Sequence, residues 1–261
     1  MPLILFVLCS LSWICGTSEA HASRTTHPYP WSETVEIAPV KSVTSLGEVR
    51  DEMREFISQH RIDPDQVLFV SDWDQVISTY KDNKENLQEG DHTQDTLEDI
   101  HSDGIEFRVL TYRGHILQDH FCDTASIGKG CTHKNKCPVT RLTQKSLKMH
   151  DFLPVLQQDF PVKSLRYSAG LLTHGAAVPS SLDSYFHGRI AFAAKSKGDT
   201  LRNLLCHVLI EKNIHHIFFV DDRWDFIEDV IAAIDYYASN DQYIGQHKIR
   251  TLQCFQFSNK K

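Results

Sequence analysis

Runs of apolar residues predict the buried strands of this chain. The two most continuous runs, Val67–Ser71 and His216–Val220, are hydrophobic at almost every position. Other segments that favour strands are Phe107–Leu110, Val162–Leu172 and Arg189–Ala193. Strands with little alternation of apolar and polar residues are typical of parallel sheets covered on both faces. The pattern therefore predicts a parallel sheet between helical layers.

Apolar residues at helical spacing lie between these runs. Thr44 or Ser45 can cap a helix that ends near His60. The apolar face of this helix holds Val49, Met53, Phe56 and Ile57. Further helices are predicted over Thr93–His101 and Gln144–Gln158, after a cap at Asp199, and around Phe226–Ile234. The hydrophilic segment Lys81–His92 is predicted to be a loop.

Strands that alternate with helices indicate an α/β fold of three layers, with a Rossmann-like parallel sheet in the middle. The runs at Val162–Leu172 and Arg189–Ala193 are predicted to form a hairpin around Pro179-Ser180-Ser181. The chain has 261 residues, which suits one large domain, and we assign residues 21–261 to it. In such sheets, ligands bind outside the carboxyl ends of the strands.

The first 20 residues resemble a secretory leader. An apolar run is followed by Ser18-Glu19-Ala20, a small-x-small pattern suited to cleavage after Ala20. We therefore expect residues 1–20 to be a signal peptide and the mature protein to be secreted or periplasmic. The leader has no Lys or Arg before its apolar run, so an uncleaved anchor is the alternative. No later segment approaches the length of a membrane span.

Charge argues against two classes of partner. The formal net charge is −7, and the chain has no long basic run. Proteins that bind nucleic acid or anionic membranes through charge usually carry a basic patch. We therefore expect neither a nucleic-acid footprint nor a polybasic membrane patch.

A cysteine-containing insertion is predicted at about residues 114–143, where the sequence is irregular and rich in polar residues. It holds Cys122, Cys131, His133 and Cys137, which could bind Zn²⁺, but an oxidising compartment favours a disulfide. After loss of the leader, Cys206 and Cys254 raise the number of cysteines to five. An odd count allows two disulfides and one free thiol.

Polar side chains follow three of the predicted strands. Asp72 and Asp74 come after the first, Thr111 after the second, and Asp221 and Asp222 after the strand that begins at His216. Each acid alone could be a helix cap or a turn residue. Four acids at one sheet edge would repel one another, however, unless a cation lies among them. Oxygen ligands of this kind suit Mg²⁺.

The order of these motifs resembles the haloacid dehalogenase superfamily. DWDQV (Asp72–Val76) is similar to its first motif and VLT (Val109–Thr111) to its second. Lys197-Gly198 resembles the third motif, and FFVDD (Phe218–Asp222) resembles the fourth. More narrowly, LTYRG (110–114), KGDTL (197–201) and FVDDR (219–223) are similar to a little-characterised group of secreted bacterial members.

The resemblance implies a Mg²⁺-dependent phosphohydrolase with the superfamily's three-layer fold and at most a small cap. Asp72 would attack phosphorus and form an aspartyl-phosphate, and Asp74 would serve as the general acid and base. Thr111, Arg113 and Lys197 would bind the phosphate. The metal would be held by Asp72, by the backbone carbonyl of Asp74, and by Asp221 or Asp222. The substrate would be a phosphorylated small molecule or a macromolecular phosphoester.

Several assignments have alternatives in the residues themselves. Lys195 competes with Lys197 for the lysine role, although the Lys-Gly context favours Lys197. Arg113 could bind phosphate through two hydrogen bonds, or it could be ordinary surface charge. Three aromatic residues beside the motifs could line a pocket or pack in the core; they are Trp73, Tyr112 and Trp224.

One position departs from the superfamily pattern. Four residues after Asp222, where the family often has Asn or Asp, the chain has Phe226. Asp225, Glu228 or Asp229 could replace the missing acid. The alternative function is a binding or effector protein that keeps the fold without catalysis. A phosphoryl transferase is disfavoured, because the Lys81–His92 loop is too short for a large lid; we expect an open site.

Overall fold

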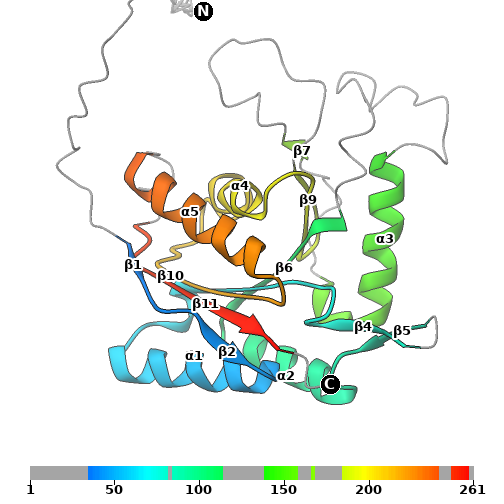
Figure 1. The fold of residues 1–261 in the computed structure, drawn as a ribbon, viewed down its shortest axis with the longest axis horizontal. Coiled ribbons are helices and arrows are strands. Elements are labelled where there is room, and N and C mark those ends of the chain that lie inside the picture. The colour runs from blue at the N-terminus through cyan, green and yellow to red at the C-terminus, as the bar shows by residue number, and fades with distance from the viewer. Residues whose placement is uncertain are drawn as a thin grey trace, which may run out of the picture. The chain divides into compact units, whose positions relative to one another are not determined.

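A mostly parallel β-sheet forms the centre of the fold (Figure 1). The computed structural model describes residues 35–81, 84–113, 138–157, 166–167, 184–240 and 248–258, all of which belong to the unit Ser32–Lys261. The long strands are β3 (Val67–Ser71), β6 (Glu106–Thr111), β9 (Ile190–Ala193), β10 (His216–Asp221) and β11 (Thr251–Phe257). The shorter strands are β1 (Glu36–Ile37), β2 (Lys41–Val43), β7 (Arg166–Tyr167) and β8 (Ser184–His187).

The strand order is β1-β11-β10-β3-β6-β9-β8-β7, and β2 also pairs with β11. Every pairing from β1 to β9 is parallel, whereas β8 pairs antiparallel with both β9 and β7. The α/β class with a mostly parallel sheet is thus confirmed. The predicted direct pairing of the 162–172 and 189–193 runs is wrong, because β8 lies between them and the β8–β9 turn is at Gly188. Residues 179–181 are outside the described residues.

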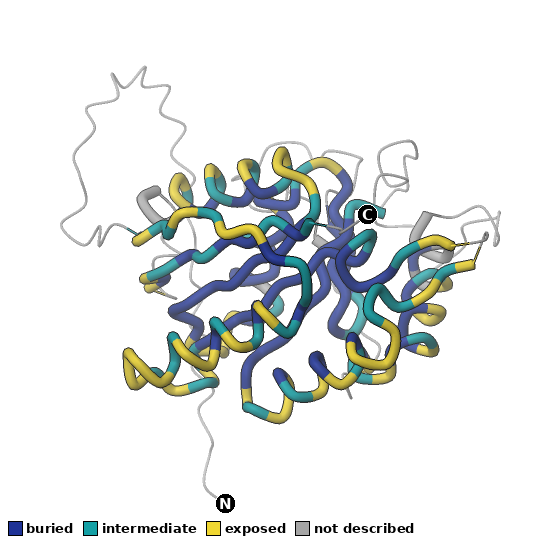
Figure 2. The backbone as a smooth tube through the Cα atoms, turned by 60° about the horizontal axis from the view of Figure 1, so that its bottom comes forward, coloured by how far each residue is buried: buried dark blue, intermediate teal, exposed yellow. Residues whose placement is uncertain are grey.

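Helices cover both faces of the sheet (Figure 1). They are α1 (Leu46–His60), α2 (Asp91–Ser102), α3 (Pro138–Phe152), α4 (Lys197–Asn203) and α5 (Trp224–Asn240). Alternate residues of β3 enter separate apolar clusters: Phe69 belongs to the cluster that includes Met53 of α1, and Val70 belongs to the cluster that includes Val230 of α5. Figure 1 accordingly shows α1 and α2 on one face and α4 and α5 on the other. The central strands are buried along their length (Figure 2).

Local signals explain where the helices begin and end. Ser45 caps α1 through a hydrogen bond from the backbone N–H of Glu48, as predicted for this position. Helix α3 begins at Pro138 and ends at Phe152, not at Gln158, because Pro154 disfavours a helical conformation at Leu153. Helix α4 begins at Lys197 and is capped by Ser196, so the predicted cap at Asp199 is wrong. A π-helical turn (Leu204–Val208) follows α4.

The polar segment after β3 is not the predicted loop. It forms a two-stranded antiparallel hairpin of β4 (Ser78–Lys81) and β5 (Lys84–Leu87). The chain reverses after β3 through Gln75, which has a φ of 65° and whose N–H donates to the Ser78 carbonyl over 2.6 Å. Positive φ is uncommon for a residue other than glycine. The turn therefore fixes where Asp74 and the hairpin leave the sheet.

The structure describes two of the five cysteines that follow residue 20. Cys206 and Cys254 are both buried, and burial raises the pKa of Cys254 to about 12. The possibility of two disulfides also involves the other three cysteines that follow residue 20, so it stays a prediction. Those three, Cys122, Cys131 and Cys137, lie with His133 and most of the predicted 114–143 insertion outside the described residues; from residue 138 onward that segment belongs to α3.

None of the helices in the described part of the chain is both long enough and apolar enough to cross a membrane.

Candidate functional site

Three strand ends deliver polar groups to the carboxyl edge of the sheet. Asp72 follows β3 and Asp221 ends β10; these strands are parallel neighbours, with Ser71 opposite Val220. The backbone N–H of Asp72 donates to the Val220 carbonyl over 2.9 Å. Thr111 ends β6 on the other side of β3 and is fully buried. The parallel register thus places the acids side by side, as the sequence pattern predicts.

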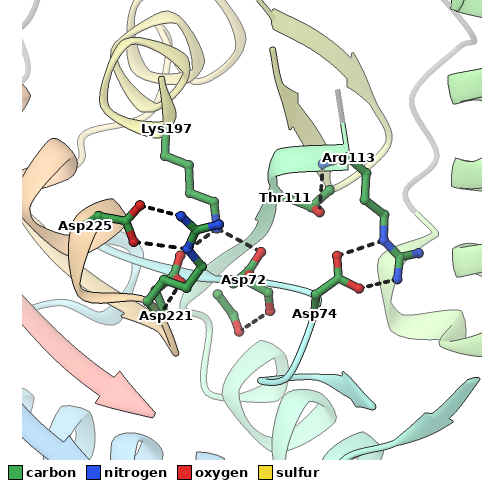
Figure 3. Close-up of polar contacts among 9 residues, drawn as sticks. Asp72, Asp74, Thr111, Arg113, Lys197, Asp221 and Asp225 are labelled. Atoms are coloured by element: carbon green, nitrogen blue, oxygen red, sulfur yellow. Dashed lines mark hydrogen bonds and ion pairs between the residues drawn. The ribbon is translucent and has the colours of Figure 1, made fainter. Parts of the chain in front are cut away.

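Lys197 lies between two of these acids (Figure 3). It is the first residue of α4 and is fully buried, with Nζ 2.8 Å from Asp72 Oδ1 and 2.5 Å from Asp221 Oδ2. Burial alone would lower the pKa of Lys197, but attraction to Asp72 and Asp221 outweighs it and raises the pKa. Lys197 is therefore a buried ammonium. Of the two candidate lysines, the structure brings Lys197 to the acids and leaves Lys195 exposed.

Asp72, Asp221 and Asp222 form a compact acidic group. Each offers one carboxylate oxygen, and the three oxygens lie within 4.8 Å of one another. Burial raises the pKa of Asp72 to about 7 and also raises the pKa values of Asp221 and Asp222. Repulsion within the group adds to this increase at Asp72 and Asp222. One lysine thus compensates three acids only in part.

The donor set fits a hard divalent cation such as Mg²⁺. All three donors are carboxylate oxygens, the ligands that Mg²⁺ prefers. Asp72 Oδ1 is buried and, among the described residues, has no well-directed hydrogen bond, although Lys197 lies close to it. The Asp74 carboxylate is not a member of this group. Its predicted contribution, a backbone carbonyl, remains a prediction.

Asp74 instead forms an ion pair with Arg113 (Figure 3). Arg113 Nε donates to Asp74 Oδ2 over 2.9 Å, and Nη2 donates to Oδ1. The backbone N–H of Arg113 donates to Thr111 Oγ1 over 3.3 Å. The guanidinium predicted to bind phosphate is therefore held by a carboxylate in this structure. The two acids of the first motif, only two residues apart, have different cationic partners.

Glu85, on β5 of the hairpin, completes this second cluster. Its Oε1 accepts three hydrogen bonds: from Arg113 Nη2 (2.8 Å), from Trp73 Nε1 (2.6 Å) and from Ser78 Oγ (3.1 Å). Partial burial would raise the pKa of Glu85, but these bonds outweigh it and lower the pKa. The sequence does not predict a role for Glu85, because the composition of this segment favours a loop rather than a hairpin. β5 is polar apart from Leu87, so its sequence gives no strand signal.

The three aromatic residues beside the motifs have separate environments. Trp73 is fully buried and packs edge-on against Phe152 of α3, so it belongs to the core. Tyr112 contacts Phe226, with 5.1 Å between ring centroids. Trp224 is exposed. Tyr112 is therefore the one of these three that packs beside the site, because the Phe226 ring it contacts lies against Lys197.

Phe226 covers the buried lysine. Its ring centroid lies 4.6 Å from Lys197 Nζ and 4.1 Å from Arg223 Cζ. The acids considered as replacements at this position are used elsewhere: Asp225 pairs with Arg223, and Asp229 accepts hydrogen bonds from Ser196 and Gly198. Glu228 is exposed. None of the three joins the group of Asp72, Asp221 and Asp222.

Gly198 allows α4 to approach α5 closely enough to bury Lys197. A Cβ atom at this position would lie 2.3 Å from the Ala233 Cβ and 2.6 Å from the Asp229 carbonyl oxygen. The backbone N–H of Gly198 also donates to Asp229 Oδ2 over 3.0 Å. The glycine that follows Lys197 is therefore required by packing.

Comparison with family models, curated proteins and solved structures found no match to this chain.

Proposed function

We propose that this protein is a Mg²⁺-dependent phosphohydrolase of the haloacid dehalogenase type that uses Asp72 as its nucleophile. The observation that carries the proposal is the buried Lys197 ammonium between Asp72 and Asp221, beside a third acid, Asp222. Such a group can hold a cation and an anionic phosphoryl group together. The substrate would be a phosphorylated small molecule or a macromolecular phosphoester, met outside the cytoplasm if residues 1–20 are a leader.

The sheet order supports the resemblance that the motifs suggest. β3 carries Asp72 in the middle of the parallel part of the sheet, between β10 with Asp221 and β6 with Thr111. In open α/β sheets, ligands bind in the crevice outside the carboxyl strand ends. The proposed catalytic residues are all at that edge.

The chemistry can be assigned to the chain's own residues. An Asp72 carboxylate oxygen forms a bond to phosphorus while the bond from phosphorus to the leaving oxygen breaks, and Asp74 protonates the leaving oxygen. Asp74 then takes a proton from the water that releases phosphate from Asp72. Mg²⁺, held by Asp72 and by Asp221 or Asp222, would supply positive charge against the phosphoryl oxygens. Lys197 and Thr111 would bind the same oxygens.

The ion pair between Arg113 and Asp74 implies a rearrangement in this scheme. Both oxygens of the Asp74 carboxylate accept hydrogen bonds from Arg113, so neither is available to a leaving oxygen. Asp74 can therefore act as an acid only after Arg113 releases it. An incoming phosphate is a suitable new partner, since guanidinium binds carboxylate and phosphate in the same two-pronged geometry. Substrate binding would thus free Asp74 at the step that needs it.

A second candidate is a binding protein without catalysis. Arg113 occupies Asp74, and Phe226 covers Lys197 in place of the polar residue that the superfamily often has there. A protein of this kind would bind the metal, and a phosphate at most, without turnover.

A phosphatase panel tests both candidates. The mature chain, Asp72→Asn and the control Asp65→Asn, an exposed acid outside the site, would be assayed on aryl and alkyl phosphates with Mg²⁺ and with EDTA. We expect Mg²⁺-dependent turnover that Asp72→Asn lowers by at least about 10³-fold and that Asp65→Asn leaves unchanged. Circular dichroism would establish that both variants fold. Full activity in Asp72→Asn would overturn the proposal, whereas thermal stabilisation by Mg²⁺ without turnover would favour the second candidate.

A further inference from the structure

A cavity of about 420 Å³ lies at the amino edge of the sheet, where β10 and β11 begin. His216 and Thr251, the first residues of these strands, are register partners and both line it. The end of α1 supplies further walls. Since β10 has six residues, this cavity is about 16 Å from Asp221 along the strand. It is therefore separate from the candidate active site.

The cavity lining is rich in basic side chains. Arg61 and Arg250 are exposed, and neither guanidinium has an ion pair or hydrogen bond to any described residue. Other described arginines do pair with acids: Arg50, Arg54, Arg108, Arg113, Arg189 and Arg223. In a chain with a net charge of −7, two arginines beside one cavity that have no partner among the described residues are an unusual juxtaposition.

His216 forms part of the cavity wall. It is buried, and its Nδ1 lies 3.0 Å from Thr251 Oγ1. Burial, and then the nearby His215, Arg250 and His60, lower its pKa to about 4. Within the described lining, the only acid is Glu36. The carbonyl end of α1 adds about half a negative charge, so two guanidinium groups still leave the cavity positive.

We infer that this cavity binds a small organic anion, a carboxylate or a phosphate on an apolar body, through Arg61 and Arg250. Its volume is within the range of about 300–1,000 Å³ that is usual for small-molecule sites. Phe56 and Ile62 supply apolar wall beside the two arginines. Guanidinium groups bind both kinds of oxyanion through paired hydrogen bonds. The inference does not depend on the proposed function.

Calorimetric titration of the full mature chain in EDTA tests the site. The probes are benzoate, inorganic phosphate and, as a neutral control, benzyl alcohol. We expect saturable binding of benzoate, of phosphate or of both, and none of benzyl alcohol. Arg61→Gln and Arg250→Gln should each weaken anion binding by about tenfold. Both side chains are exposed, so these variants should fold as the parent does.

Arg54→Gln is the matched control, because it removes the same charge from α1 at a position outside the cavity, where Arg54 pairs with Asp103. Anion binding should be unchanged in this variant. Phosphate bound at the candidate active site would survive both cavity substitutions and is thereby distinguished. Benzoate binding alone would identify the ligand as a carboxylate, and phosphate binding alone would identify it as a phosphate. The inference is overturned if neither anion binds, or if binding is the same in all three arginine variants.

Discussion

The two ends of strand β10 hold charge in opposite ways. At its carboxyl end, Asp221 is buried and pairs with the buried Lys197. At its amino end, His216 lies beside Arg61 and Arg250, which are exposed and form no ion pair with a described residue. Buried charge must be compensated by protein groups, whereas exposed charge is compensated by water. The acidic end is therefore fixed by the fold, and the basic end is available to a ligand.

The largest effect is expected from removing the buried cation. Lys197→Met leaves Asp72 and Asp221 buried without their partner and should lower the free energy of unfolding by about 3–5 kcal/mol. The exposed Lys195→Met is the control and should change it by less than about 0.5 kcal/mol. Urea unfolding at pH 8 in EDTA measures both values, and Mg²⁺ should restore part of the loss. Equal effects of the two substitutions would show that the acidic end is not held by Lys197.

A smaller effect on stability, one that depends on pH, is expected at the amino end of β10. The folded-state pKa of His216, about 4, is below the ordinary value of 6.5. Between these values the unfolded chain binds the additional proton, so this residue's contribution to stability is complete above pH 6.5 and is lost as the pH falls toward 4. His216→Gln should reduce this change by about 2 kcal/mol.

Unfolding free energies at pH 4.5 and pH 7, compared between variant and parent, measure the His216 contribution. His92→Gln is the control, because His92 is exposed on α2. The comparison cancels the titration of all other groups. If the pH dependence is the same in the parent and in both variants, the folded protein does not lower the pKa of His216.

The smallest effect is expected in the half-exposed cluster around Asp74. Glu85→Gln keeps an acceptor oxygen for Arg113, Trp73 and Ser78 but removes the charge, and should cost about 1 kcal/mol of stability. Glu98→Gln, on the exposed face of α2 where Glu98 bonds to Gln94, should cost less. Thermal unfolding of both variants gives the comparison. If Glu85→Gln lowers stability as much as Lys197→Met does, the cluster around Asp74 contributes as much to stability as the buried cluster around Lys197.

The buried half of the fold is the half that the sequence predicts well. Continuous apolar runs identify β3 and β10 because burial on both faces requires hydrophobic residues at every position. The acids that follow these runs then reach one edge because parallel strands end there. The Lys-Gly context favours Lys197 over Lys195 in the sequence. The structure shows that Lys197 is the buried lysine of the two, at the point where α4 approaches α5 closely.

The exposed half is harder to predict. The β4–β5 hairpin has few apolar residues, because both of its strands are largely solvated, so its composition favours a loop. The contact of Arg113 with Asp74 joins residues 39 positions apart, and its contact with Glu85 joins residues 28 apart. Such pairs depend on where the hairpin lies. For α4, Ser196 and Asp199 are both good caps, and only backbone geometry selects Ser196.

Gly198 links the packing of two helices to the charge of the site. Because no larger side chain fits between Ala233 and the Asp229 carbonyl, a substitution at Ala233 or Gly198 would move α4 and withdraw the ammonium of Lys197 from Asp72. Mutations far from any ligand would then change the electrostatics of the acidic edge. The packing of α4 against α5 and the position of the Lys197 ammonium are therefore coupled. A change in the lysine's position requires compensating substitutions in both helices.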